Sequence, residues 1–318
     1  MASVRRVASI DRFRGLAILG MILANFLAGV SGLPAWMKHP ADVGLHPPDI
    51  VAPMFIVAIG LTYRLSFARR ARKGARAAYL SFARRYGLLL LIGFCITFAG
   101  IAAGLQHPAV PWGLLETIGA AGLVTLAFVA LPTSARIAVG LGLLGVWQFA
   151  LDTWWLDRVR SAIHNGPWGV LAWSAMLILA TAFADYYHAE KRAAVWAFAC
   201  GSTVAGIGLA LLVPISKVRA SSSYVLATLG ISLLIFLAID EVVRRREGFL
   251  RVLDPWGSNA LTLYLVQGVG LGIFALPPWP GWYHFAPAWL TALQALAFVV
   301  ALDAFARLLD RRGWHLRL

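Results

Sequence analysis

Long apolar runs alternate with short polar linkers along almost the whole chain. Most runs supply about the 20 apolar residues that a helix needs to cross a bilayer, and one, the fifth, is shorter. The runs are continuous rather than alternating in polarity, which favours helices over strands. Ten runs follow this pattern, at residues 13–32, 50–68, 86–105, 112–131, 136–151, 168–187, 193–213, 223–243, 259–277 and 287–306. We therefore expect an all-α protein, a polytopic bundle of about ten transmembrane helices forming a single domain over residues 1–318.

The charges of the linkers predict the orientation of the bundle. With the amino terminus inside, 23 of the 28 lysines and arginines fall on the cytoplasmic side. The five that remain outside are Lys38, Arg158, Arg160, Lys217 and Arg219. Cytoplasmic linkers of membrane proteins carry this kind of excess. Both termini are therefore expected in the cytoplasm, with the first apolar run retained as a span rather than removed as a signal peptide.

Composition excludes several other classes of protein. The chain is 60% apolar and only 13% charged, with a mean hydropathy of +0.75. A soluble domain of this length has no room to hide so much apolar surface. A net charge of +14 would normally suggest a nucleic-acid partner. Because most of this charge lies in the cytoplasmic linkers, topology explains it and no nucleic-acid partner is expected.

Two sets of polar residues belong to the first span. Asp11 and Arg14 have the i, i+3 spacing that allows side chains to pair on one face of a helix. They form either an interfacial ion pair or a brace for a pocket on the cytoplasmic side. Asn25 lies deeper in the same span, where a buried amide needs partners. It either joins neighbouring helices or donates a hydrogen bond to a ligand carbonyl.

His39 lies in the first outside linker, ten residues before Asp49 at the start of the second span. A histidine with a carboxylate to orient it is the usual arrangement of a general base. His46 competes for this role, and a linker histidine is often simply solvated. A metal site formed by His39, Asp42, His46 and Asp49 is a further alternative, although the spacing matches no standard ligand pattern.

Other polar residues lie near the ends of spans. Glu116 and Asn259 have the most distinctive local sequences, whereas Asp185, Asp240 and Asp303 lie near predicted cytoplasmic ends. The ordinary explanation for these three aspartates is pairing with nearby arginines. The chain has no phosphate-binding loop or nucleophile elbow.

Several segments together resemble a known family. In chain order they are SIDRFRG (9–15), KHPADVGL (38–45), DIVAPMF (49–55), WGLLETI (112–118), PISK (214–217), SSYVL (222–226) and WGSNALTLY (256–264). They are similar to the catalytic membrane domain of the heparan-α-glucosaminide N-acetyltransferase family, within the wider group of transmembrane acyltransferases. In that family a histidine lies ten residues before an Asp-x-Val-x-Pro motif and five before a glycine, and His39, Asp49 and Gly44 repeat this spacing. Glu116 and Thr117 depart from it, because they stand where the family has Gln-Arg.

The resemblance implies a reaction and roles for the residues. The reaction is transfer of an acetyl or other acyl group from cytosolic acyl-CoA, without a metal, to an extracytoplasmic amino sugar or glycan. His39 is then the catalytic base or a transient carrier of the acyl group, Asp49 orients it, and Asn25 donates to the acyl carbonyl. The residues expected to line the donor or acceptor path are Asp11, Arg14, Glu116, Lys217, Tyr224 and Asn259.

A transporter or channel for a small solute is the rival interpretation, because intramembrane polar residues suit it equally well. Transporters often carry internal repeats, and none is evident between the first and second five spans. The absence of Asn-x-Ser/Thr sequons and of a large domain before the first span favours a bacterial inner membrane over a lysosome. The identity of the acceptor stays open, as does the formation of a homodimer.

Overall fold

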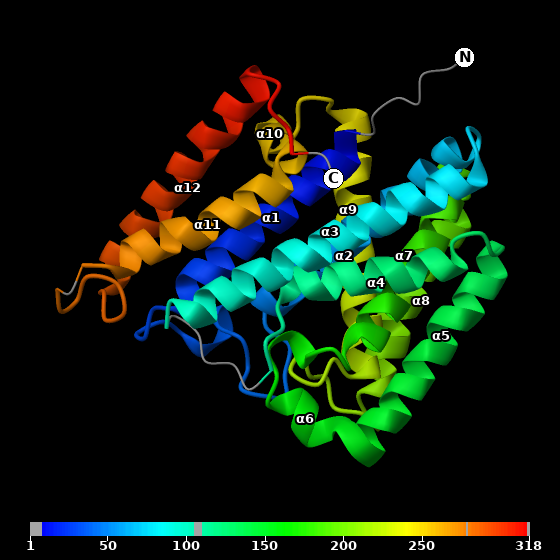
Figure 1. Ribbon diagram of the computed structural model, residues 1–318, viewed down its shortest axis with the longest axis horizontal. Coiled ribbons are helices and arrows are strands. Elements are labelled where there is room, and N and C mark those ends of the chain that lie inside the picture. Colours follow the sequence, from blue (N-terminus) through cyan, green and yellow to red (C-terminus); the bar gives the residue numbers. More distant parts are fainter. Residues whose placement is uncertain (1–7, 105–109, 278, 317–318) are drawn as a thin grey trace. The chain divides into compact units, whose positions relative to one another are not determined.

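The computed structural model describes residues 8–104, 110–277 and 279–316, and within these ranges the regular structure is helical (Figure 1). Arg5, Arg6 and Arg317, which contribute to the predicted charge asymmetry, lie outside the described residues. The helices are α1 (Ala8–Ala28), α2 (Pro48–Ala71), α3 (Ala75–Ala102), α4 (Leu114–Phe128), α5 (Thr133–Ala150), α6 (Leu156–Arg160), α7 (Val170–His188), α8 (Arg192–Leu209), α9 (Ser222–Arg245), α10 (Asp254–Ser258), α11 (Ala260–Ala275) and α12 (Ala288–Arg311). A π-helical turn at Leu151–Trp155 joins α5 to α6. The predicted all-α polytopic membrane architecture is confirmed.

Each of the ten apolar runs corresponds to a helix of at least 15 residues, but not every helix has the length and composition of a membrane span. In the described part of the chain seven helices do, or eight if α10 and α11, bent by 82° at Asn259, form one broken span. The α1 helix begins earlier than predicted and includes Asp11, Arg12 and Arg14, and α4 has only 15 residues. The predicted number of ten crossings is therefore higher than length and composition alone support.

The chain divides into two compact units, and the division falls inside α2 and α9. Unit 1 comprises Met1–Pro40, His46–Phe55 and Ile235–Arg317. Unit 2 comprises Ala41–Leu45 and Ile56–Leu234. The single domain expected over residues 1–318 therefore stays a prediction.

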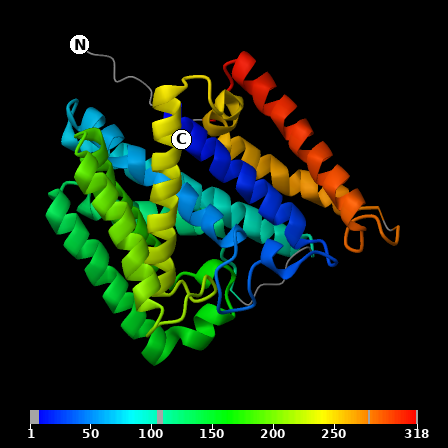
Figure 2. The ribbon, with the colours of Figure 1, turned by 180° about the vertical axis from the view of Figure 1, so that it is seen from behind.

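In unit 1, α1, α11 and α12 run side by side, as Figures 1 and 2 both show. The short helix α10 crosses the start of α1 so closely that no side chain fits between the two backbones. A Cβ atom at Gly257 would overlap the backbone carbonyl of Asp11, and one at Gly15 would overlap that of Leu253. Towards the other end of α1, Phe26 is fully buried against the rings of Phe274, Tyr283 and Phe298. Two glycines and one aromatic cluster thus fix both ends of α1.

In unit 2, α7 is the central helix and packs against α4, α5 and α8. Nearly every residue of α7 from Ala172 to Ala184 is buried. The α3 helix packs along α4 (Figure 1), where Gly119 and Gly122 admit the backbone and ring of Tyr86. Because α7 is apolar on all sides, its burial follows from its sequence.

The contacts between linkers agree with the predicted grouping of linkers on two sides of the bundle, whereas the orientation itself stays a prediction. On the predicted outside of unit 2, Asp42 contacts both Arg160 and Arg219, and Asn165 donates to the carbonyl of Val218 at 2.7 Å. On the predicted inside, Asp185 accepts hydrogen bonds from Arg64 and Thr133, both at 2.6 Å. These contacts join linkers that the charge pattern assigns to the same side of the membrane.

The pairing expected for the three span-end aspartates is confirmed. Asp185 binds Arg64 and also the fully buried Arg136. The other two pairs, Asp240 with Arg244 and Asp303 with Arg307, join residues four apart on one helix face. An ordinary ion-pair role therefore accounts for all three carboxylates.

Candidate active site

His39 and Asp49 lie together in unit 1, where the linker after α1 leads into α2. Nδ1 of His39 is 2.6 Å from Oδ1 of Asp49. The Asp49 side chain is completely buried, whereas that of His39 is 36% exposed. The sequence brings them together because Pro48 starts α2 and places Asp49 in its first turn, where the helix dipole favours a negative charge. The carboxylate predicted to orient the histidine is thus in contact with it.

The structure distinguishes His39 from its competitor His46. Nδ1 of His46 lies 2.7 Å from the carbonyl oxygen of Lys38, to which it donates. The backbone N–H of His46 donates to Oδ2 of Asp49 at 2.8 Å. The carboxylate therefore contacts the ring of His39 and only the backbone of His46. This difference favours His39 as the histidine with the electrostatic support that a general base needs.

The His39–Asp49 contact also selects a protonation pattern for the ring. A carboxylate accepts hydrogen bonds, so the short contact places a proton on Nδ1 of His39. In the neutral ring the lone pair then lies on Nε2, the nitrogen opposite the carboxylate. A carboxylate in this position can stabilise an imidazolium on the ring that it contacts, as the aspartate of a catalytic triad does.

Asn25 is not buried, in contrast to the expectation from the sequence. The sequence places it well inside an apolar run, but its side chain is exposed in the structure. Helical periodicity explains the difference, because the neighbouring residue Phe26 takes the buried face of α1. The expectation that Asn25 is a buried amide joining helices is wrong, and its role as a donor to a substrate carbonyl stays a prediction.

The predicted pair of Asp11 and Arg14 is present at the start of α1. Nη1 of Arg14 lies 3.3 Å from Oδ1 of Asp11 and 3.5 Å from the carbonyl oxygen of Gly257. These residues lie in the first turns of α1, whereas His39 follows its last turn. The structure therefore does not bring Asp11 and Arg14 to His39.

Arg12 is a residue that the sequence analysis missed. Its side chain is only 3% exposed and donates from Nε to Asp254 at 3.0 Å and from Nη1 to the carbonyl of Glu247 at 2.7 Å. A buried arginine needs such partners. The sequence signal for Arg12 was its position between Asp11 and Arg14 at the start of a span. A group of charges at such a position indicates a buried ion pair.

Asn259 has a structural explanation. It lies at the 82° bend between α10 and α11, where its amide donates to the carbonyl of Pro255 at 3.0 Å. Its Oδ1 lies 3.1 Å from Nδ1 of His315. These contacts satisfy a side chain at a helix break.

Three further candidates belong to unit 2. Glu116 is buried in α4 and accepts a 2.6 Å hydrogen bond from Thr97 of α3. Tyr224 is fully buried at the start of α9, edge-on to Trp173. Lys217 is half-buried in the linker between α8 and α9, where its carbonyl accepts from Asn165 at 3.0 Å. Glu116 and Tyr224 are thus enclosed by protein, and the place of all three residues along the path of donor or acceptor stays a prediction.

Asp42 forms a second polar cluster in unit 2 that the sequence analysis did not predict. Oδ1 accepts from Nε of Arg219 at 2.8 Å and from Ser216 at 2.9 Å, and Oδ2 accepts from Nη2 of Arg219 at 2.5 Å. The hydrogen bond from Arg219 and the one from Ser216 outweigh burial and hold the pKa of Asp42 below its usual value of 3.8. Asp42 is thus paired with Arg219, and among the residues that the structure describes no group of three or more histidine, cysteine or carboxylate side chains could hold a metal ion.

These observations define a class of protein, a polytopic helical membrane protein with an accessible histidine held by a buried carboxylate after its first helix. Residues 6–190 match the family model of the catalytic domain of heparan-alpha-glucosaminide N-acetyltransferase. The match covers more than half of the chain, so the chain belongs to this family of membrane acetyltransferases. It contains His39, Asp49 and the 112–118 segment, whereas the similar segments at 214–226 and 256–264 lie outside it. No curated protein matches the chain.

Proposed function

We propose that this protein transfers an acetyl group from cytosolic acetyl-CoA to an amino sugar or glycan on the other side of the membrane. The single observation that carries the proposal is the 2.6 Å contact between His39 and the buried carboxylate of Asp49. Family membership supplies the reaction class, an acetyl transfer. The predicted orientation, which places His39 outside, supports an extracytoplasmic acceptor.

In the direct form of the reaction, Nε2 of His39 takes the proton of the acceptor amine or hydroxyl. The freed lone pair attacks the thioester carbonyl, and the C–S bond breaks once the tetrahedral intermediate collapses. The CoA thiolate then receives the proton from His39. Asp49 stabilises the imidazolium through Nδ1 in the interval, and general base catalysis of this kind contributes about 10²- to 10⁴-fold in rate.

In the covalent form, Nε2 of His39 itself attacks the thioester carbonyl, the C–S bond breaks, and CoA leaves as the thiolate. The acceptor then displaces the neutral imidazole from the acetyl group, and its proton passes to the thiolate. Both forms use the same tautomer of His39 and the same role for Asp49. Labelled acetyl trapped on the protein in the absence of acceptor supports the covalent form, and its absence during active turnover supports direct transfer.

The remaining candidates have subordinate roles in the proposal. Asn25, exposed near the outer end of α1, donates to the acyl carbonyl as negative charge develops on its oxygen. Arg14 and Lys217, neither of which is fully exposed, contribute positive charge along the path of the substrates. We place the protein in a bacterial inner membrane, which gives access to cytosolic acetyl-CoA and to envelope glycans.

The test compares two histidine variants of the purified full-length protein. CoA thiol release from acetyl-CoA is measured with glucosamine as the probe acceptor, for the wild type, His39→Ala and His46→Ala. We expect His39→Ala to lose at least about 10²-fold in turnover, because it removes the proton acceptor. His46→Ala is the matched control and is expected to retain most of the activity, since only the backbone of His46 contacts Asp49.

Full turnover by His39→Ala would contradict both forms of the mechanism. If the wild type neither binds nor hydrolyses acetyl-CoA and instead moves a small solute across liposome membranes, the rival transporter function is correct. The thermal stability of the wild type is measured with and without acetyl-CoA. A shift shows that the purified protein is folded and binds the donor, so that a loss of turnover in a variant can be compared with it.

A further inference from the structure

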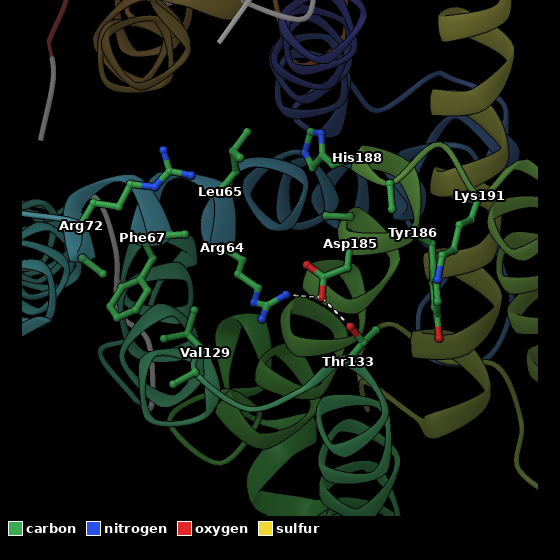
Figure 3. Close-up of a pocket in the computed structure, with 15 residues that line it drawn as sticks. Arg64, Leu65, Phe67, Arg72, Val129, Thr133, Asp185, Tyr186, His188 and Lys191 are labelled. Atoms are coloured by element: carbon green, nitrogen blue, oxygen red, sulfur yellow. Dashed lines mark hydrogen bonds and ion pairs between the residues drawn. The ribbon is translucent and has the colours of Figure 1, made fainter. Parts of the chain in front are cut away.

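Unit 2 contains a cavity of about 820 Å³ at the end of α2 and the end of α7, closed on another side by the turn between α4 and α5 (Figure 3). The residues that line it come from three linkers and the helix ends beside them, namely the linkers after α2, α4 and α7. The charge pattern places all three in the cytoplasm. The cavity therefore opens on the side where phosphorylated cofactors are made.

Positive charge predominates around this cavity. Arg64, Arg72 and Lys191 line it together with one carboxylate, that of Asp185. Asp185 already forms an ion pair with Arg64 (Figure 3), and it also pairs with the buried Arg136, so its negative charge is balanced by these two arginines. Arg72 and Lys191 are exposed, and neither forms an ion pair with any residue that the structure describes. A cavity with this surplus favours an anion.

The walls between the charges are apolar or aromatic. Phe67, Val129 and Tyr186 line the same cavity, alongside several alanines. Arginine guanidinium groups match the geometry of phosphate oxygens and bind them through two hydrogen bonds. A ligand that joins a phosphate to a ring or to a short apolar portion fits this combination better than a simple inorganic ion.

We propose that this cavity binds a phosphate-bearing ligand through Arg64, Arg72 and Lys191. Two sources have this chemistry, the phosphorylated nucleotide end of acyl-CoA and the headgroup of an anionic phospholipid. The nucleotide source rests on the proposed function, whereas the lipid source does not. Both sources share a phosphate group, which Arg72 and Lys191 would hold while Asp185 keeps Arg64 in place.

The experiment uses the full chain in zwitterionic detergent and adenosine 3′,5′-bisphosphate as the nucleotide probe, because it carries the phosphates but no thioester. Binding is measured for the wild type and for the double variant Arg72→Gln/Lys191→Gln. The matched control is Lys73→Gln/Arg76→Gln, which removes two exposed charges close to Arg72 in the sequence that do not line the cavity. We expect the cavity variant to weaken binding about tenfold or more and the control by less than about twofold.

The lipid source is tested with the same variants in nanodiscs of phosphatidylcholine with or without phosphatidylglycerol. A rise in thermal stability with phosphatidylglycerol that the cavity variant alone loses supports the site with a lipid ligand. The proposal is overturned if neither the nucleotide nor the lipid distinguishes the cavity variant from the control. Nucleotide binding that depends on Arg72 and Lys191, in a protein without acetyl transfer, keeps this site and rejects the proposed function.

Discussion

The carboxylate of Asp49 is fully buried, yet it lies 2.6 Å from Nδ1 of a histidine whose side chain is 36% exposed. A buried charge of this kind needs hydrogen bonds, and those from the His39 ring and the His46 backbone help supply them. One end of His39 is therefore fixed by the protein while the ring as a whole remains accessible. This geometry suits a group that is held in one orientation and exchanges a proton with a substrate.

Asp49→Asn tests this relationship. The amide keeps the size of the side chain and can still accept from the His46 backbone, but it lacks the negative charge that stabilises an imidazolium. We expect kcat for acetyl transfer to fall by about 10²-fold or more, while KM for acetyl-CoA changes little. Steady-state kinetics on purified protein measure both quantities. Unchanged kcat in a folded Asp49→Asn protein would show that the contact has only a structural role.

The lowered pKa of Asp42 predicts that the stability of the folded protein depends on pH. Its pKa in the folded protein is below the usual 3.8, chiefly because of the hydrogen bond from Arg219. A lowered folded-state pKa stabilises the protein above pH 3.8, and this contribution is lost as the pH falls below that value through the folded-state pKa. Thermal unfolding in detergent between pH 7 and pH 3 is expected to show this loss.

Asp42→Asn provides the control for that measurement. Removing the charge is expected to lower stability at pH 7 by about 1.5–3 kcal/mol, the range for hydrogen bonds to charged groups. The difference between the wild type and the variant should shrink as the pH falls below 3.8, because Asp42 then binds a proton more readily in the unfolded chain than in the folded protein. A difference that stays constant over this range would contradict the assignment to Asp42.

Gly257→Ala tests the close crossing of α10 and α1. The new Cβ atom would overlap the backbone carbonyl of Asp11, so the two helices must separate. We expect a loss of about 1–3 kcal/mol in stability, as in other overpacked sites. Gly268→Ala in α11 is the matched control because its Cβ atom meets no atom within 4 Å. Equal melting temperatures for the two variants would show that the crossing is looser than described.

Asp185→Asn removes the charge that faces a fully buried arginine. Arg136 would lose its ion-pair partner while remaining without access to water, and such uncompensated burial costs about 3–5 kcal/mol. Glu241→Gln is the control, because it breaks an exposed pair with Arg245 on the surface of α9. Exposed pairs contribute about 1 kcal/mol or less. Thermal unfolding in detergent is expected to show a large shift for Asp185→Asn and a small one for Glu241→Gln.

The His39–Asp49 pair could be predicted because both residues belong to one linker and the first turn of the next helix. Chain connectivity limits how far apart they can lie, so spacing carries information about contact. The same reasoning could not choose between His39 and His46, because both lie within reach of the carboxylate. Only the folded linker, which turns Nδ1 of His46 to the carbonyl of Lys38, separates them.

Contacts between segments far apart in the chain were harder to predict from the sequence. From the sequence, Arg136 was counted only as one of the cytoplasmic charges that predict the orientation. An arginine within an apolar run also indicates a buried partner. Its binding to Asp185, 49 residues away, depends on how α5 packs against α7. Asp42 and Arg219 are separated by 177 residues and have no shared pattern that would reveal their pairing.

The sequence by itself determined that the protein is a helical membrane protein, because a bilayer accepts only long apolar helices or closed barrels and the runs are continuous. It also determined the predicted orientation, since the charge asymmetry of the linkers is a local property. The tertiary structure decided which face of each helix is buried, and so exposed Asn25 while burying Arg12 and Arg136. The reason is physical: hydropathy is a property of each segment, whereas the partners of a buried polar group are supplied by whichever helices pack around it.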